Sequence, residues 1–210
     1  MVRRGLIYLL GWFAVCLTTS TATAQDAQSW LSRMNHAVEE LSYQGTFLHM
    51  QGGNAETLQI AHLNEDGRVS ERIIALDGVA REIIRHEDEV QCIFPDRQAV
   101  LLEERRDVSP LVSALPSYSD ELLRHYEFTL LESARVVQRQ TQIVSIKPKD
   151  GFRYGYTLWL DQDTAMPLKS QLVDDQGNIL EQILFAQLDI SDSIPRSALE
   201  PSINIEGFRI

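Results

Sequence analysis

The amino-acid sequence predicts an α+β fold in which a strongly curved antiparallel sheet, a half-open barrel, wraps around one or more helices. Two observations support this fold. An amphipathic segment near the N-terminus is followed by a long series of β-rich segments separated by turn residues, with no recurrent strand–helix–strand alternation. We count roughly nine to eleven strands. A sheet of that length must curl or close, and the helix can fill its interior.

The first 24 residues have the pattern of a secretory signal peptide. Arg3 and Arg4 precede an apolar stretch at residues 6–17, and the segment ends on the small residues 22–24. A membrane anchor is the alternative, but the apolar stretch is shorter than the roughly 20 residues that a spanning helix needs. We therefore expect export, with cleavage after Ala24.

The chain that follows is acidic and carries one cysteine. Removal of residues 1–24 takes away two arginines and no acidic residue, so the formal charge moves from −11 to −13. This charge disfavours nucleic acid and anionic membrane surfaces as partners. Only Cys92 remains after cleavage, which excludes a disulfide within the chain. We expect its side chain to be buried, and a disulfide with sequence outside this chain is the alternative.

Residues 26–42 are expected to form an amphipathic helix. Asp26 is placed to cap the first turn. The apolar residues recur at helical spacing, as Trp30, Met34, Ala37, Val38 and Leu41. This face should pack against the inside of the curved sheet.

The first group of strands forms an antiparallel meander bounded by turn residues. Its members are expected at residues 43–50, 57–63, 68–76, 80–85, 89–94 and 98–104. If the first hairpin turns at Gly52-Gly53, paired residues have numbers that sum to about 105. Tyr43 should then face His62.

A polar stretch at 103–119 interrupts the strands and is expected to be a loop, followed by a short helical turn at 120–125. The second group of strands is expected at residues 126–132, 139–148, 152–161, 167–174 and 178–190. Residues 174–178 are a good hairpin turn. For Phe152 and Tyr154, which open the third of these strands, we favour core packing over a ligand lining.

The apolar face of the sheet is the candidate ligand site, because apolar concave surface in excess of what one helix covers indicates binding. Period-2 reasoning assigns six residues to this face, namely Phe47, Leu58, Ile60, Ile83, Leu158 and Leu160. Arg81 and Arg85 share a strand face and are candidates for contact with a lipid phosphate or an acidic partner. For the two arginines the sequence favours an exposed strand face without a ligand over such a contact.

The sequence contains no recognisable catalytic or cofactor-binding motif. It lacks a nucleophile elbow, a glycine-rich phosphate loop, the zinc-protease motif and paired cysteines. The histidines fall on separate expected elements without the spacing of metal ligands, as His36, His49, His62, His86 and His125. We expect a binding protein without cofactor or metal, and no set of residues supports the third option, a hydrolase of envelope components.

Four ordered segments resemble the large N-terminal domain of the MucB/RseB family. They are WLSRM at 30–34, YQGTFLHM at 43–50, RIIALDGVAREIIR at 72–85 and the long block at 154–188 that begins YGYTLWLDQD. The resemblance implies a LolA/LolB-like half-barrel for residues 25–190. It also implies that residues 191–210 are a linker towards a C-terminal domain absent from this chain, which could hold a partner for Cys92.

The resemblance further implies a function. Members of this family are periplasmic negative regulators of envelope-stress sigma factors. They bind the periplasmic part of a transmembrane anti-sigma factor (RseA/MucA-like) and shield it from proteolysis, with the large domain as a lipid or lipopolysaccharide sensor. A LolA-like carrier of lipid or lipoprotein is the alternative, and self-association is left open. The small domain is implicated in holding the anti-sigma factor, so binding by this chain alone is in question.

Overall fold

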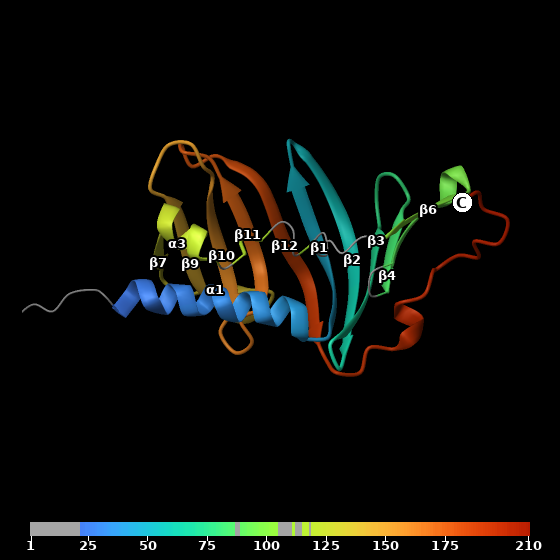
Figure 1. Cartoon of the computed structure of the whole chain (residues 1–210), viewed down its shortest axis with the longest axis horizontal. Coiled ribbons are helices and arrows are strands. Elements are labelled where there is room, and N and C mark those ends of the chain that lie inside the picture. Colours follow the sequence, from blue (N-terminus) through green and yellow to red (C-terminus); the bar gives the residue numbers. More distant parts are fainter. Residues whose placement is uncertain (1–21, 87–88, 105–110, 112–114, 118) are drawn as a thin grey trace, which may run out of the picture.

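The structure is a computed structural model that describes residues 22–86, 89–104, 111, 115–117 and 119–210 (Figure 1). The signal peptide expected at 1–24 lies almost entirely outside these residues. Among the helices described, none is long and apolar enough to cross a membrane.

A long helix lies along the inside of the sheet, as the hydrophobic spacing predicted. Helix α1 spans Ala22–Glu40, so it begins and ends slightly earlier than the expected 26–42. Its fully buried residues Leu31, Met34 and Val38 recur every three or four positions, which places them on one stripe. That stripe faces the sheet, and α1 packs mainly against β7 (Tyr126–Leu130).

Twelve antiparallel strands form one open sheet in the described part of the chain. In spatial order they run β6-β5-β4-β3-β2-β1-β12-β11-β10-β9-β7, with β8 also paired to β9. The remaining strands are β1 (Tyr43–Gln51), β2 (Asn54–Glu65), β3 (Arg68–Ala75), β4 (Glu82–His86), β5 (Glu89–Phe94), β6 (Ala99–Glu104), β8 (Ala134–Val136), β9 (Arg139–Pro148), β10 (Gly155–Asp161), β11 (Pro167–Val173) and β12 (Ile179–Ile190). The predicted fold class is confirmed.

The register of the first hairpin agrees with the prediction. Tyr43 is opposite His62, and Gln51 is opposite Asn54. Gly52 and Gly53 form the two-residue turn with φ of 58° and 84°, the left-handed conformation that such turns require. The Tyr43 and His62 rings stack with centroids 4.7 Å apart, which fixes this pair on the inner face.

Two expectations for the second half of the sheet are wrong. Strand β10 begins at Gly155 and not at residue 152, so Phe152 and Tyr154 lie in the preceding loop and are 95% and 55% exposed instead of packed in the core. Strand β8 was not expected, because its turn uses Val137 and Gln138 with φ of 49° and 62°, residue types that do not signal a turn.

The elements between the two groups of strands are described in part. Helix α3 (Asp120–His125) forms where a helical turn was expected, and the Ser119 hydroxyl caps it by accepting from the Leu122 backbone N–H at 3.1 Å. The loop expected at 103–119 lies largely outside the described residues, but its Leu111 and Leu115 are buried in the main core. A short 3-10 helix, η1 (Pro95–Arg97), links β5 to β6.

The main core lies between α1 and the concave face of the sheet. Helix residues such as Leu31 and Met34 join one cluster with strand residues such as Phe47, Ile146 and Phe185. Because side chains alternate along a strand, the cluster takes alternate residues of regular strands, such as Leu158 and Leu160 of β10. The register shift between Thr46 and Phe47 adds one residue on β12, so the cluster passes there from Phe185 to Leu188.

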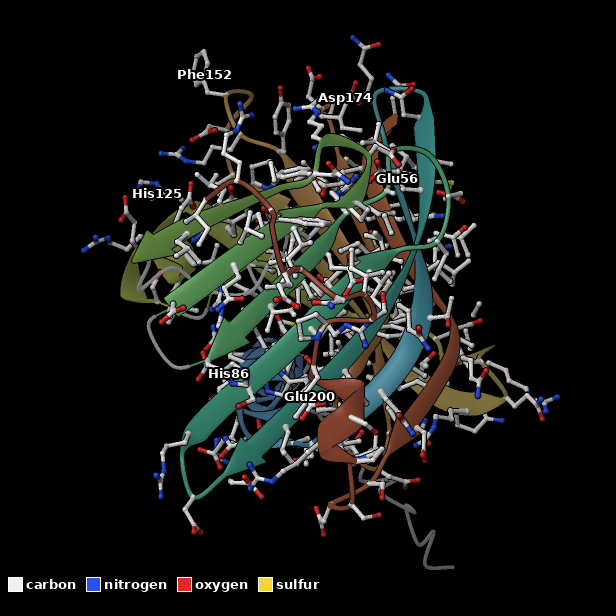
Figure 2. All side chains as sticks on the ribbon, turned by 90° about the vertical axis from the view of Figure 1, so that its right-hand side faces the viewer. Glu56, His86, His125, Phe152, Asp174 and Glu200 are labelled. Carbon is white, nitrogen blue, oxygen red and sulfur yellow. The ribbon has the colours of Figure 1, made fainter. Side chains whose placement is uncertain are left out.

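Residues 191–210 pack on the opposite, convex face of the sheet (Figure 2). Ile194 and Leu199, on either side of the 3-10 helix η2 (Arg196–Ala198), are buried against Ala61 and Leu63 of β2. Figure 2 shows this segment, with Glu200 labelled, crossing in front of the teal and green strands. A second apolar cluster holds its later part, formed by Ile84, Ile93, Val100, Ile203, Ile205 and Phe208.

Candidate functional site

A cavity of about 330 Å³ opens on the concave face near the β1–β2 turn. We call it the concave cavity and define it by His49, Gln51, Glu56, Leu58, Ile73, Ala75, Arg81 and Ile83. These residues come from β1, β2, β3 and β4, except for Arg81, which immediately precedes β4. The register places them all on the face that carries Phe47, because Phe47 pairs with Leu58, Leu58 with Ala75, and Ile73 with Ile83.

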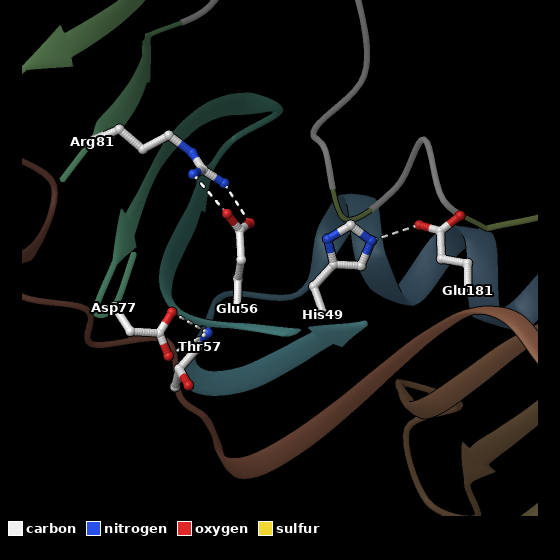
Figure 3. A network of polar contacts seen from close by, with 6 residues as sticks. All are labelled: His49, Glu56, Thr57, Asp77, Arg81 and Glu181. Atoms are coloured by element: carbon white, nitrogen blue, oxygen red, sulfur yellow. Dashed lines mark hydrogen bonds and ion pairs between the residues drawn. The ribbon is translucent and has the colours of Figure 1, made fainter. Parts of the chain in front are cut away.

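One wall of the concave cavity is an ion pair (Figure 3). The Arg81 guanidinium donates to both carboxylate oxygens of Glu56, at 3.0 and 2.7 Å. This bidentate hydrogen bonding lowers the pKa of Glu56 and raises the pKa of Arg81. Both side chains are about one-third exposed, so the pair sits at the mouth of the cavity and not in its interior.

A second polar contact closes the neighbouring side. The His49 ring Nε2 lies 2.7 Å from Oε1 of Glu181 on β12. The Gln51 side-chain amide donates to the other Glu181 oxygen at 3.3 Å. These contacts join β1 to β12 at the rim of the cavity. In the adjoining loop, Asp77 accepts from the Thr57 backbone N–H at 3.0 Å, which lowers the pKa of Asp77.

The floor of the cavity is apolar. Leu58 and Ile73 are 7% and 3% exposed, and Ile83 is half-buried beside them. An apolar floor below a rim of paired charges suits an amphipathic ligand, with its aliphatic part inside and its polar group at the mouth. Because Glu56 occupies the Arg81 guanidinium, an anionic headgroup would have to displace that carboxylate.

The structure brings together three of the eight residues that the sequence indicated. Leu58, Ile83 and Arg81 line the concave cavity. Four others lie on the same face but are 0–3% exposed within the main core, namely Phe47, Ile60, Leu158 and Leu160. Arg85 faces the same side further along β4, where it pairs with Glu71 of β3 in the register, and its buried Nε atom has no hydrogen-bond partner. A ligand contact for any of these residues stays a prediction.

Sequence reasoning missed two charged residues at the rim, Glu56 and Glu181. Glu56 is opposite His49 in the register, so the sum of about 105 already contained that pairing. Glu181 could not be found in this way, because it requires the pairing of the first strand with the last one across 130 residues of chain. Among the described residues, no cluster of three or more His, Cys, Asp or Glu side chains could hold a metal ion.

Comparison with known proteins gives the family. The sequence model of the MucB/RseB N-terminal domain matches residues 26–203. The chain belongs to the MucB/RseB family. One curated MucB/RseB relative, the sigma factor AlgU regulatory protein MucB of Pseudomonas aeruginosa, is 35% identical over 192 residues, which cover 90% of this chain and 58% of that protein. The chain therefore spans less than two-thirds of the length of this relative.

Solved MucB structures share the fold. A crystal structure of MucB superimposes with a TM-score of 0.69 at 30% identity, covering 85% of this chain and 63% of that one. The complex of Pseudomonas aeruginosa MucA and MucB gives a TM-score of 0.68 at 31% identity, covering 84% of this chain and 61% of that one. The MucB/RseB proteins compared are regulators by their names, and MucB has been solved with MucA.

Proposed function

We propose that this protein is a periplasmic, non-catalytic negative regulator of an envelope-stress sigma-factor pathway. In this role it binds the periplasmic part of a transmembrane anti-sigma factor and shields that segment from proteolysis. The observation that carries the proposal is the family match over residues 26–203, supported by the likeness to MucB solved with MucA. The net charge of −11 also favours a soluble binding protein over one that recognises nucleic acid.

The same proposal assigns lipid or lipopolysaccharide sensing to the concave cavity. Its volume of about 330 Å³ is at the lower end of the range of about 300–1,000 Å³ for small-molecule sites, and its floor is apolar. A lipid can change the affinity for the anti-sigma factor only if it binds one of two states of the protein more tightly than the other. A lipid phosphate could replace the Glu56 carboxylate as the partner of Arg81, which would release Glu56 on β2 from the ion pair. The lipid would then prefer the state of the protein in which this ion pair is broken.

Binding to an anti-sigma segment tests the regulatory role. The purified protein should bind the periplasmic segment of Pseudomonas aeruginosa MucA in calorimetry and protect it from a site-specific protease added in trace amount. The protein is used from residue 25 onward, the form expected after cleavage of the signal peptide, and this form contains all of residues 26–203. The same assays are run on a version with the family's C-terminal domain restored, and absence of binding and protection by both proteins would refute the regulatory proposal.

A cavity-filling variant tests the lipid site. We expect Leu58→Trp to weaken binding of a fluorescent fatty acid by about tenfold or more, because the indole fills the apolar floor. The matched control is Leu48→Trp, since Leu48 pairs with Thr57 on the convex face of the same hairpin. If Leu58→Trp and the wild-type protein bind the fatty acid with equal affinity, the proposal that this cavity is the lipid site is refuted.

A LolA-like carrier of lipid or lipoprotein is the second candidate, and the same apolar floor favours it. In this role the protein transports the lipid or lipoprotein that it binds, and it does not bind an anti-sigma factor. Mass spectrometry of protein extracted from its native host separates the two. Stoichiometric bound lipid together with no affinity for the MucA segment would favour the carrier.

A further inference from the structure

The convex face carries a second, larger cavity that the proposed lipid site does not use. It has a volume of about 630 Å³ and crosses β12, β1, β2 and β3, with Ala198 at one wall. We call it the polar groove and define it by six of its lining residues, Gln44, Thr46, Gln59, Arg72, Gln187 and Asp189. It backs onto the same strands as the concave cavity but faces the opposite side of the sheet.

The sheet register arranges these side chains in two rows across the strands. In the first row Gln187 pairs with Thr46, and Thr46 pairs with Gln59. In the second row Asp189 pairs with Gln44, and Gln44 pairs with Ala61. Ala61 in turn pairs with Arg72 of β3, which ends the row.

Of the twelve residues that line the groove, four have uncharged hydrogen-bonding side chains, two are charged, and six are apolar or glycine. Glutamine amides both donate and accept hydrogen bonds, so they can pair with peptide N–H and C=O groups alike. The groove therefore suits main-chain recognition better than it suits an acyl chain.

The same face already holds a polypeptide segment beside the groove. Arg72 donates to the backbone carbonyl of Ala198 at 3.3 Å, and Glu82 accepts from the backbone N–H of Ser202 at 3.0 Å. Ile194 and Leu199 anchor this segment on β2. Apart from the short helix η2, residues 191–208 have no regular secondary structure. The convex face thus recognises the main chain of a crossing segment through buried side chains, and the polar groove is continuous with that interface at Ala198.

The spacing of the first row matches an extended peptide. Neighbouring strands lie about 4.8 Å apart, so Gln187 and Gln59, on either side of β1, are about 9.6 Å apart across the sheet. An extended chain advances about 3.3 Å per residue, and three residues therefore span this distance. Both glutamines are exposed and can reach such a chain.

We propose that the polar groove binds an extended segment of the anti-sigma factor, laid across β12, β1 and β2 next to residues 191–208. This inference rests on the proposed function and names the surface that would carry it. The peptide main chain pairs with Gln187 and Gln59, and a basic residue of the segment lies at the Asp189 end, where the exposed carboxylate gives the groove a negative terminus.

The test compares groove variants in binding to the Pseudomonas aeruginosa MucA periplasmic segment. We expect the double variant Gln59→Ala/Gln187→Ala to bind at least about tenfold more weakly than wild-type protein, the loss of roughly two modest hydrogen bonds. The matched control is Gln140→Ala, an exposed glutamine on β9 at the far end of the sheet, which should bind like the wild type. Thermal unfolding of each variant establishes that it is folded.

Four outcomes would overturn the inference. Full affinity of the double variant refutes the groove proposal but leaves the regulatory function intact, whereas failure of both the wild-type chain and the version with the C-terminal domain restored to bind refutes the groove and the function together. A concentration-dependent dimer in light scattering that only the double variant loses would show that a second copy of the chain occupies the groove. Charge reversal by Asp189→Lys should also weaken binding, and stronger binding by that variant contradicts the proposed orientation.

Discussion

The buried Arg72–Glu82 pair should be the most costly charge interaction to break on the convex face. The Arg72 guanidinium lies 3.0 Å from Oε2 of Glu82, and the two residues are 8% and 3% exposed. Glu82 also accepts from the backbone and the hydroxyl of Ser202, so it holds residues 191–210 on the sheet. Glu82→Gln keeps the shape of the side chain but leaves a buried guanidinium without its counter-charge.

Removal of one partner from a buried pair costs about 3–5 kcal/mol, and the retained amide oxygen places Glu82→Gln near about 3 kcal/mol. For a domain of this size that corresponds to a fall in Tm of about 6–12 °C. Urea unfolding followed by circular dichroism measures the free energy directly. Hydrogen exchange at residues 198–203 should increase at the same time, because the segment loses its anchor.

The exposed pair of Arg196 and Glu65 is the matched control. Their side chains are 2.9 Å apart and 78% and 54% exposed, and they also join the C-terminal segment to β2. We expect Glu65→Gln to cost less than about 1 kcal/mol, because water already solvates both charges. An equal cost for Glu82→Gln and Glu65→Gln would refute the reasoning from burial.

Two further changes have outcomes set by the geometry. Gly45→Ala should destabilise the protein by about 1–3 kcal/mol in urea unfolding, since its Cβ would lie 2.5 Å from the Gln187 carbonyl oxygen, whereas Gly151→Ala meets no atom within 4 Å and should have little effect. The low pKa of Glu56 beside Arg81 means that this pair stabilises the fold above the unfolded pKa of about 4.5 and loses its effect as pH falls through the folded pKa. The difference in unfolding free energy between wild-type protein and Glu56→Gln should be no more than about 1 kcal/mol at pH 7 and should vanish in acid; a constant difference would contradict this assignment.

The regularity of the strands explains which predictions succeeded. The Gly52-Gly53 turn and the period of two are enough to place Tyr43 opposite His62. The prediction failed at Phe152. Aromatic composition alone suggested a strand there, but this residue lies in the loop between β9 and β10. Composition indicates which residues favour strands, but the end of a strand depends on where its neighbour stops pairing.

The candidate site was predictable only in part for a similar reason. The structure places Leu58, Ile83 and Arg81 around one cavity, and alternation along a strand is a local property that the sequence carries. Glu181 reaches the rim only through the pairing of β1 with β12, which includes the bulge at Thr46. A pairing that joins the two ends of the chain leaves no signal at short range.

The sequence by itself determined the succession of one long helix and many strands and the alternation of sides within the regular strands, because helical and strand periodicity are set by neighbours within a few residues. Its ordered motifs, and not its periodicity, carry the resemblance to the family. Only the tertiary structure decided how fully each inner residue is enclosed, so that Leu160 is 0% exposed while Leu58, in the same core cluster, also borders a cavity. It also decided that residues 191–210 pack on the convex face, since burial depends on which surfaces the fold brings together over the whole chain.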